Sequence, residues 1–145
     1  MNYRLRSNGG LVYFTPKLRV AYRPRGDVRS LASQYYHYGR WRYEVMRRHP
    51  ASVNLRYLAP PTALLALVGG TIAGVAGTLT WPWLMLGFAA PVTYVAAVLA
   101  ASVLTSRGLA PGPRALLNLV YPTMHITWGA GFLSSVMSYR QRGRQ

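Results

Sequence analysis

Hydrophobic residues are distributed very unevenly along the chain. Residues 57–106 form a run of fifty positions without Asp, Glu, Lys, Arg or His. Because a helix that crosses a bilayer needs roughly 20 apolar residues, this run predicts two transmembrane helices, at about 58–78 and about 84–105. Trp81 and Trp83 lie in the short turn between them and are of the residue type enriched at membrane interfaces.

A third apolar segment, at about 115–138, follows a polar loop over 106–114. Four residues interrupt it: Asn118, Pro122, His125 and Gly129. It therefore predicts a third span, but less strongly than the first two. In total we expect two to three spans within a membrane region over 57–138. The last residues, 139–145, form a basic tail.

The beginning of the chain has a different periodicity. Over 1–26 a short helical turn and the turn signal "SNGG" precede apolar residues that alternate as in a β-strand. These are Val12, Phe14, Leu18, Val20 and Tyr22. The pattern predicts a strand or β-hairpin. An isolated hairpin is marginally stable in water, so we expect another part of a protein to pack on it.

Between the strand-like segment and the apolar run lies a basic, aromatic segment over 27–50. Asp27 is a suitable N-cap and Pro50 a suitable stop for a helix over about 28–48. Tyr35 and Tyr38 lie near its apolar face, and most of its arginines lie elsewhere. The pattern is typical of an amphipathic helix in the headgroup plane of a membrane, although a helix packed on a soluble domain has a similar pattern.

Composition restricts the chemistry of the chain. Its 17 Lys and Arg residues against 2 acidic residues give a net charge of +15. Such charge is typical of proteins that bind nucleic acid or anionic membranes, and the fifty uncharged residues favour the membrane. There is no cysteine, and the three histidines are too dispersed for a metal set. Two carboxylates hardly suffice for acid–base or carboxylate-metal catalysis, so we assign no catalytic or metal-binding residue.

One group of residues on the predicted helix could recognise a ligand. Gln34, Arg40 and Trp41 lie within two turns of one another, with His37 between them. An arginine can bind a phosphate or diphosphate through two parallel hydrogen bonds, and a tryptophan can stack on a sugar. Non-specific anchoring to anionic headgroups would use the same residue types.

The segments "YFTPKLRVAYRPR" and "QYYHYGRWRYEVMRRHP" resemble the end of the catalytic domain of bacterial family 2 glycosyltransferases. The nearest type is the membrane-bound, succinoglycan-like group that makes extracellular polysaccharides. "LRYLAPP" and "YPTMHITWGAGFL" look like the membrane helices that follow in that group. The resemblance covers nearly the whole chain. It implies that 1–26 is the remnant of an α/β nucleotide-sugar domain, followed by mainly α-helical membrane structure.

In such enzymes an Asp-x-Asp motif holds Mg²⁺ or Mn²⁺ and the donor diphosphate, and a later acidic motif supplies the general base. Both would precede Met1. The resemblance assigns Gln34, Arg40 and Trp41 to contacts with the donor diphosphate and acceptor. Their spacing departs from the Gln-x-x-Arg-Trp of processive synthases, which argues against processive action.

We therefore expect the C-terminal part of a glycosyltransferase in the bacterial plasma membrane, with its N-terminal region in the cytoplasm. The full enzyme would transfer a sugar from a nucleotide-sugar to a lipid-linked or polysaccharide acceptor, and this chain alone would be inactive. Its partners would include membrane lipid and the missing catalytic half, but no nucleic acid. The alternative is a small non-enzymatic membrane subunit with a basic cytoplasmic helix.

Overall fold

The computed structural model describes residues 2–21 and 26–142, which are mainly helical. The first helix, α1 (Asn2–Ser7), is followed by irregular chain up to residue 21. The predicted strand or hairpin in 1–26 is wrong, because the described residues contain no strand; Tyr22 lies outside them. A strand needs a neighbouring strand to accept its backbone hydrogen bonds, and none is present here. Leu11 is 96% exposed and Phe14 is 90% exposed.

Helix α2 (Val28–Arg48) has the bounds that the sequence predicts. The carboxylate of Asp27 accepts a hydrogen bond from the backbone N–H of Ser30 at 2.8 Å, so it caps the helix N-terminus as expected. Two short 3₁₀ turns, η1 (Pro50–Ser52) and η2 (Leu55–Tyr57), connect α2 to the next helix.

The apolar run folds into a helical hairpin. It consists of α3 (Ala59–Leu79), the 3₁₀ segment η3 (Pro82–Phe88) and α4 (Ala89–Thr105). Glycines allow α3 and η3 to lie in close contact: a Cβ at Gly70 would be 2.5 Å from the carbonyl oxygen of Gly87, and one at Gly74 would be 2.7 Å from the ring of Phe88. The glycine-rich face of α3 is therefore used within the chain.

Both arms of this hairpin are long and apolar enough to cross a membrane. The 21 residues of α3 give about 31 Å of helix at ~1.5 Å per residue, which matches a hydrocarbon core of about 30 Å. Large apolar side chains cover the outside of the hairpin; Leu79, for example, is 82% exposed. Exposed apolar surface of this extent indicates contact with lipid or protein rather than water.

The third predicted span is not supported. Residues 115–138 belong to a longer helix, α5 (Pro111–Arg142), which is not among the described helices with the length and hydropathy of a span. Arg114, Asn118 and His125 interrupt its apolar sequence, and Pro122 lies within it. Instead, α5 packs on α2 and on both arms of the hairpin.

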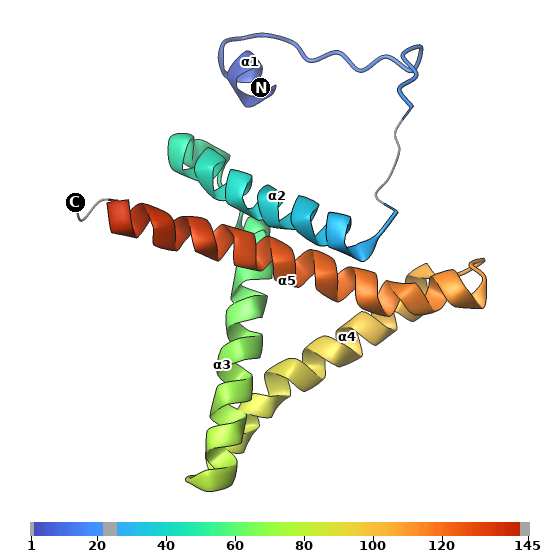
Figure 1. The fold of residues 1–145 in the computed structure, drawn as a ribbon. Coiled ribbons are helices and arrows are strands. Elements are labelled where there is room, and N and C mark those ends of the chain that lie inside the picture. The colour runs from blue at the N-terminus through green and yellow to red at the C-terminus, as the bar shows by residue number, and fades with distance from the viewer. Residues whose placement is uncertain (1, 22–25, 143–145) are drawn as a thin grey trace.

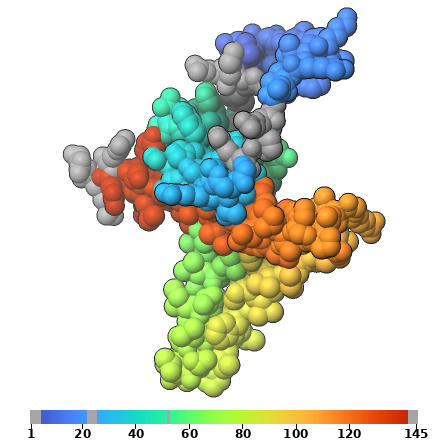
Figure 2. All heavy atoms as spheres, turned by 45° about the vertical axis from the view of Figure 1, so that its right-hand side comes forward, coloured from blue at the N-terminus to red at the C-terminus, as the bar shows by residue number. Residues whose placement is uncertain are grey.

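Figure 1 shows α3 and α4 as a V, with α5 lying across its open end and α2 beside α5. In the space-filling view of Figure 2, the two arms extend from the body that α2 and α5 form. Trp81 and Trp83 lie at the closed end of the V, between α3 and α4. Since residues 57–106 carry no charge, the charged side chains of the described helices are at the open end.

Candidate functional site

The pair formed by α2 and α5 provides the polar surface of the molecule. The two helices run in the same direction and touch backbone to backbone, because Gly39 lies against Trp128 and Phe132, and Gly131 lies against Tyr36. Neither glycine has room for a Cβ. The Tyr36 hydroxyl donates a hydrogen bond to Ser134 at 3.0 Å beside this crossing. The close crossing brings side chains from both helices into shared pockets on either side.

One of these pockets, of about 350 Å³, is formed by α2 and α5 alone. The residues that line it are polar or aromatic: His37, Arg40, Trp41, Glu44, Arg48, Ser135 and Tyr139. Arg40 forms no ion pair among the described residues. Its guanidinium is therefore available to an anionic ligand, and Trp41, which is 68% exposed, offers a ring face beside it.

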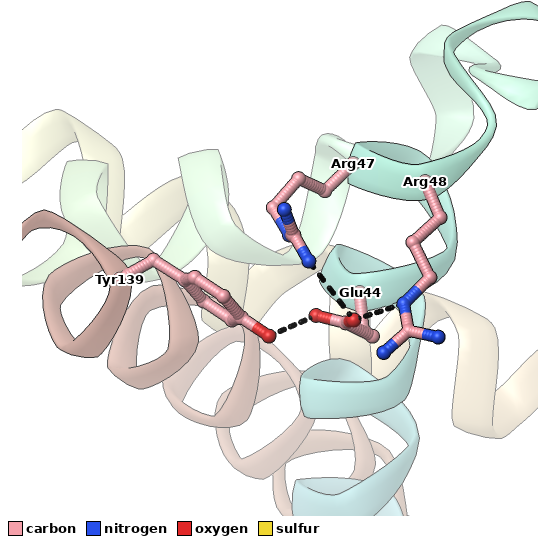
Figure 3. Close-up of polar contacts among 4 residues, drawn as sticks. All are labelled: Glu44, Arg47, Arg48 and Tyr139. Carbon is pink, nitrogen blue, oxygen red and sulfur yellow. Dashed lines mark hydrogen bonds and ion pairs between the residues drawn. The ribbon is translucent and has the colours of Figure 1, made fainter. Parts of the chain in front are cut away.

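Glu44 organises one wall of this pocket. Its carboxylate accepts hydrogen bonds from Tyr139 on α5 and from Arg48, and a third from Arg47 at 3.2 Å (Figure 3). The hydrogen bond from Tyr139, followed by those from Arg47 and Arg48, lowers the pKa of Glu44 from 4.5 to about 2. A carboxylate with this pKa is a weak base at neutral pH, so Glu44 is suited to orient the arginines and Tyr139 rather than to accept a proton.

The structure places the three predicted ligand contacts on one exposed side of α2 but in two adjoining pockets. Arg40 and Trp41 line the first pocket. Gln34 lines a neighbouring one of about 580 Å³, where its amide nitrogen donates a hydrogen bond to the Tyr38 hydroxyl at 2.6 Å. His37 lines both pockets and joins them. A ligand that contacts all three residues would have to extend over His37.

The predicted interface aromatics lie at the two ends of the molecule. Tyr35 and Tyr38 are on α2, with ring centroids 5.5 Å apart. Trp81 and Trp83 are at the closed end of the hairpin, 6.4 Å apart and both more than 60% exposed. This arrangement fits two interfaces about one apolar helix apart.

Sequence reasoning missed two clusters. The first joins Glu44 to Tyr139, which are 95 positions apart; no local pattern relates residues so distant in sequence. The second lies where α2, η2 and the start of α3 meet. There the guanidinium carbon of Arg42 is 4.0 Å and that of Arg56 is 5.4 Å from the ring centroid of Tyr57. The only sequence signal for it is the position of Arg56 and Tyr57 at the boundary of the apolar run.

The chain is similar to the succinoglycan biosynthesis protein ExoA of Rhizobium meliloti (strain 1021). The two are 28% identical over 143 residues, which make up 98% of this chain and 41% of that protein. The chain thus spans less than half the length of this relative. No family model and no solved structure matches it.

Proposed function

We propose that this chain is the membrane part of a family 2 glycosyltransferase of polysaccharide biosynthesis. The observation that carries the proposal is a similarity over 98% of the chain to a protein named for succinoglycan biosynthesis. In this proposal the hairpin of α3 and α4 crosses the bacterial plasma membrane, and α2 and α5 lie at its cytoplasmic face. The full enzyme transfers a sugar from a nucleotide-sugar to a lipid-linked or polysaccharide acceptor.

The pockets on α2 support a role in binding the donor. Arg40 is free of ion pairs among the described residues and lies beside the exposed ring of Trp41. Diphosphate oxygens match the paired donors of a guanidinium, and an indole ring can pack on a sugar. We assign Arg40 to the donor diphosphate, and Gln34 and Trp41 to the sugar and acceptor.

In this proposal the catalytic residues belong to a nucleotide-sugar domain that lies outside this chain. Asp27 caps α2, and Glu44 is engaged by Tyr139 and two arginines. These are the only two acidic residues, so neither an Asp-x-Asp for Mg²⁺ or Mn²⁺ nor a general base is at hand. The exposed apolar side chains of Leu11 and Phe14 would be covered by that domain.

A chimera tests this proposal directly. The 143 matching residues of the R. meliloti protein are replaced by this chain, and succinoglycan is measured in cells that lack the original protein. We expect polymer to be made. Arg40→Gln in the chimera should lower its production about 10-fold or more, because a hydrogen-bonded charge contact contributes about 1.5–3 kcal/mol. The control Arg107→Gln removes the same charge in the loop before α5 and should have no such effect.

Two results would contradict the proposal. One is a chimera that reaches the membrane in normal amounts but makes no polymer. The other is sugar transfer by this chain alone, purified and supplied with nucleotide-sugars and Mg²⁺, because the proposal places the catalytic acids elsewhere. Full activity of the Arg40→Gln chimera would refute the donor-site assignment only.

The scarcity of acidic residues also suits a second function, that of a small non-enzymatic membrane subunit whose basic helix holds anionic lipid or a partner. The genomic DNA just upstream distinguishes the two. Coding sequence for an Asp-x-Asp domain, in frame or separated by a frameshift, supports the glycosyltransferase. Unrelated sequence supports the subunit.

A further inference from the structure

The cluster of Arg42, Arg56 and Tyr57 lies at the boundary between the charged and the apolar parts of the molecule. Arg56 and Tyr57 form the end of η2, and α3 begins two residues later. A pocket of about 340 Å³ opens here, and these three side chains line it together with Tyr35 and His125. Pro60, Met124 and Trp128 provide an apolar wall. The pocket therefore combines cationic and apolar surface at the level of a lipid headgroup.

Two positive charges share this pocket without a carboxylate. Both guanidinium groups approach the same ring, at 4.0 Å for Arg42 and 5.4 Å for Arg56. Neither forms an ion pair among the described residues, whose two acids are engaged elsewhere. Cation–π contacts stabilise each arginine modestly, but like charges at a low-dielectric boundary repel each other. An anion bound in this pocket, close to both guanidinium groups, would reduce that repulsion.

The ring of Tyr57 experiences this positive potential. A hydrogen bond from Arg56, followed by the charge of Arg42, lowers the pKa of its hydroxyl from the usual 10.0. The hydroxyl itself can donate a hydrogen bond to a phosphate oxygen. Three groups that favour an anion thus line one small pocket beside apolar side chains.

We propose that Arg42, Arg56 and Tyr57 bind the phosphate of a lipid, whose glycerol or first chain carbons pack against Pro60, Met124 and Trp128. A phosphate monoester or diester offers the oxygens that a pair of guanidinium groups binds best. The inference rests on the membrane placement proposed above but does not require sugar transfer. It applies equally to a bilayer phospholipid and to an isoprenyl phosphate.

Native mass spectrometry of the purified full chain in detergent, with added lipids, tests the site. We expect one phosphatidylglycerol or isoprenyl phosphate to be retained about tenfold more strongly than phosphatidylethanolamine, whose cationic ammonium group offsets the charge of its phosphate and is repelled by the two arginines. The double variant Arg42→Gln/Arg56→Gln should lose about tenfold of that retention, an effect in the range of lost charge-assisted contacts. The control Arg107→Gln/Arg114→Gln removes the same charge near the start of α5 and should change retention less than about twofold.

Different results identify the source of the phosphate. If the chain prefers isoprenyl phosphate to phosphatidylglycerol and the Arg42→Gln/Arg56→Gln variant loses that preference, the site binds an isoprenyl ligand. If the chain prefers phosphatidylglycerol and the variant loses that preference, the site binds a phospholipid. Displacement of either lipid by inorganic phosphate at comparable concentration would overturn the proposal, because the lipid part would then add nothing. Equal loss in both double variants would also overturn it. Circular dichroism shows whether each variant keeps its helical structure. If the double variant does not fold, the single variant Arg56→Gln is used in its place.

Discussion

Glu44 connects the two helices of the polar surface through a single carboxylate. Its contacts with Tyr139, Arg47 and Arg48 hold its pKa near 2, against 4.5 for an unperturbed carboxyl group. Because the pKa is lowered in the folded chain, the ionised carboxylate stabilises the fold fully above about pH 4.5. That contribution is lost as the pH falls towards 2.

Glu44→Gln should therefore lower the thermal unfolding temperature of the detergent-solubilised chain by a few degrees at neutral pH. The difference from the natural chain should shrink between about pH 4.5 and pH 2, following the pKa of Glu44. Tyr139→Phe removes the largest cause of the shift, so it should raise the lower end of this interval and make the interval narrower. The control is Ser138→Ala, which lies next to Tyr139 on the exposed side of α5. If the difference in unfolding temperature between Glu44→Gln and the natural chain did not depend on pH, the lowered pKa of Glu44 would be contradicted.

The sequence predicts which residues have ligand-binding side chains better than it predicts which residues those side chains contact. Gln34, Arg40 and Trp41 are recognisable as ligand-binding types and do lie on one exposed side of α2. They are separated into two pockets because of helix geometry and because of the path of α5. The path of α5 cannot be predicted from the sequence of α2. The contact between Glu44 and Tyr139 requires the whole fold.

Among the elements, the contact between α2 and α5 depends on two glycines. Gly39→Leu adds a side chain where the backbone of Trp128 and Phe132 already lies. Overpacking of this kind costs about 1–3 kcal/mol, so we expect a lower unfolding temperature and loss of the hydrogen bond between Tyr36 and Ser134. Gly69→Leu is the matched control, because a Cβ there has no neighbour within 4 Å. Equal stability of the two variants would show that the helices do not cross at Gly39.

Helix positions are the part of the fold that the sequence predicts well. Asp27 marks the start of α2, and the two spans expected at about 58–78 and about 84–105 lie close to α3 and to the second candidate span, Pro82–Thr105. Capping and long apolar runs are local signals, which explains this success. Strand formation and membrane insertion of a borderline segment depend on what packs beside them. The predicted strand is wrong, and the third span is not supported.

For the whole molecule, the arrangement separates charge from apolar surface. The hairpin of α3 and α4 is uncharged, whereas most arginines of the described helices lie on α2, on η2 and near the ends of α5. An even number of spans places both ends of the hairpin on one side of the membrane. In the proposed topology the arginines before and after it would then lie together in the cytoplasm, as the positive-inside rule expects. A third span would have placed the basic tail outside.

Cysteine labelling in intact bacterial cells tests whether the chain crosses the membrane twice, with both ends in the cytoplasm. The chain has no cysteine, so Gly26→Cys, Thr80→Cys and Ser138→Cys each introduce a single exposed site. A membrane-impermeant maleimide should label Thr80→Cys in intact cells, and should label Gly26→Cys and Ser138→Cys only after the membrane is permeabilised. Labelling of Ser138→Cys but not of Gly26→Cys in intact cells would show that α5 crosses the membrane. Labelling of both would show that the topology is inverted, and either result would contradict the proposed topology.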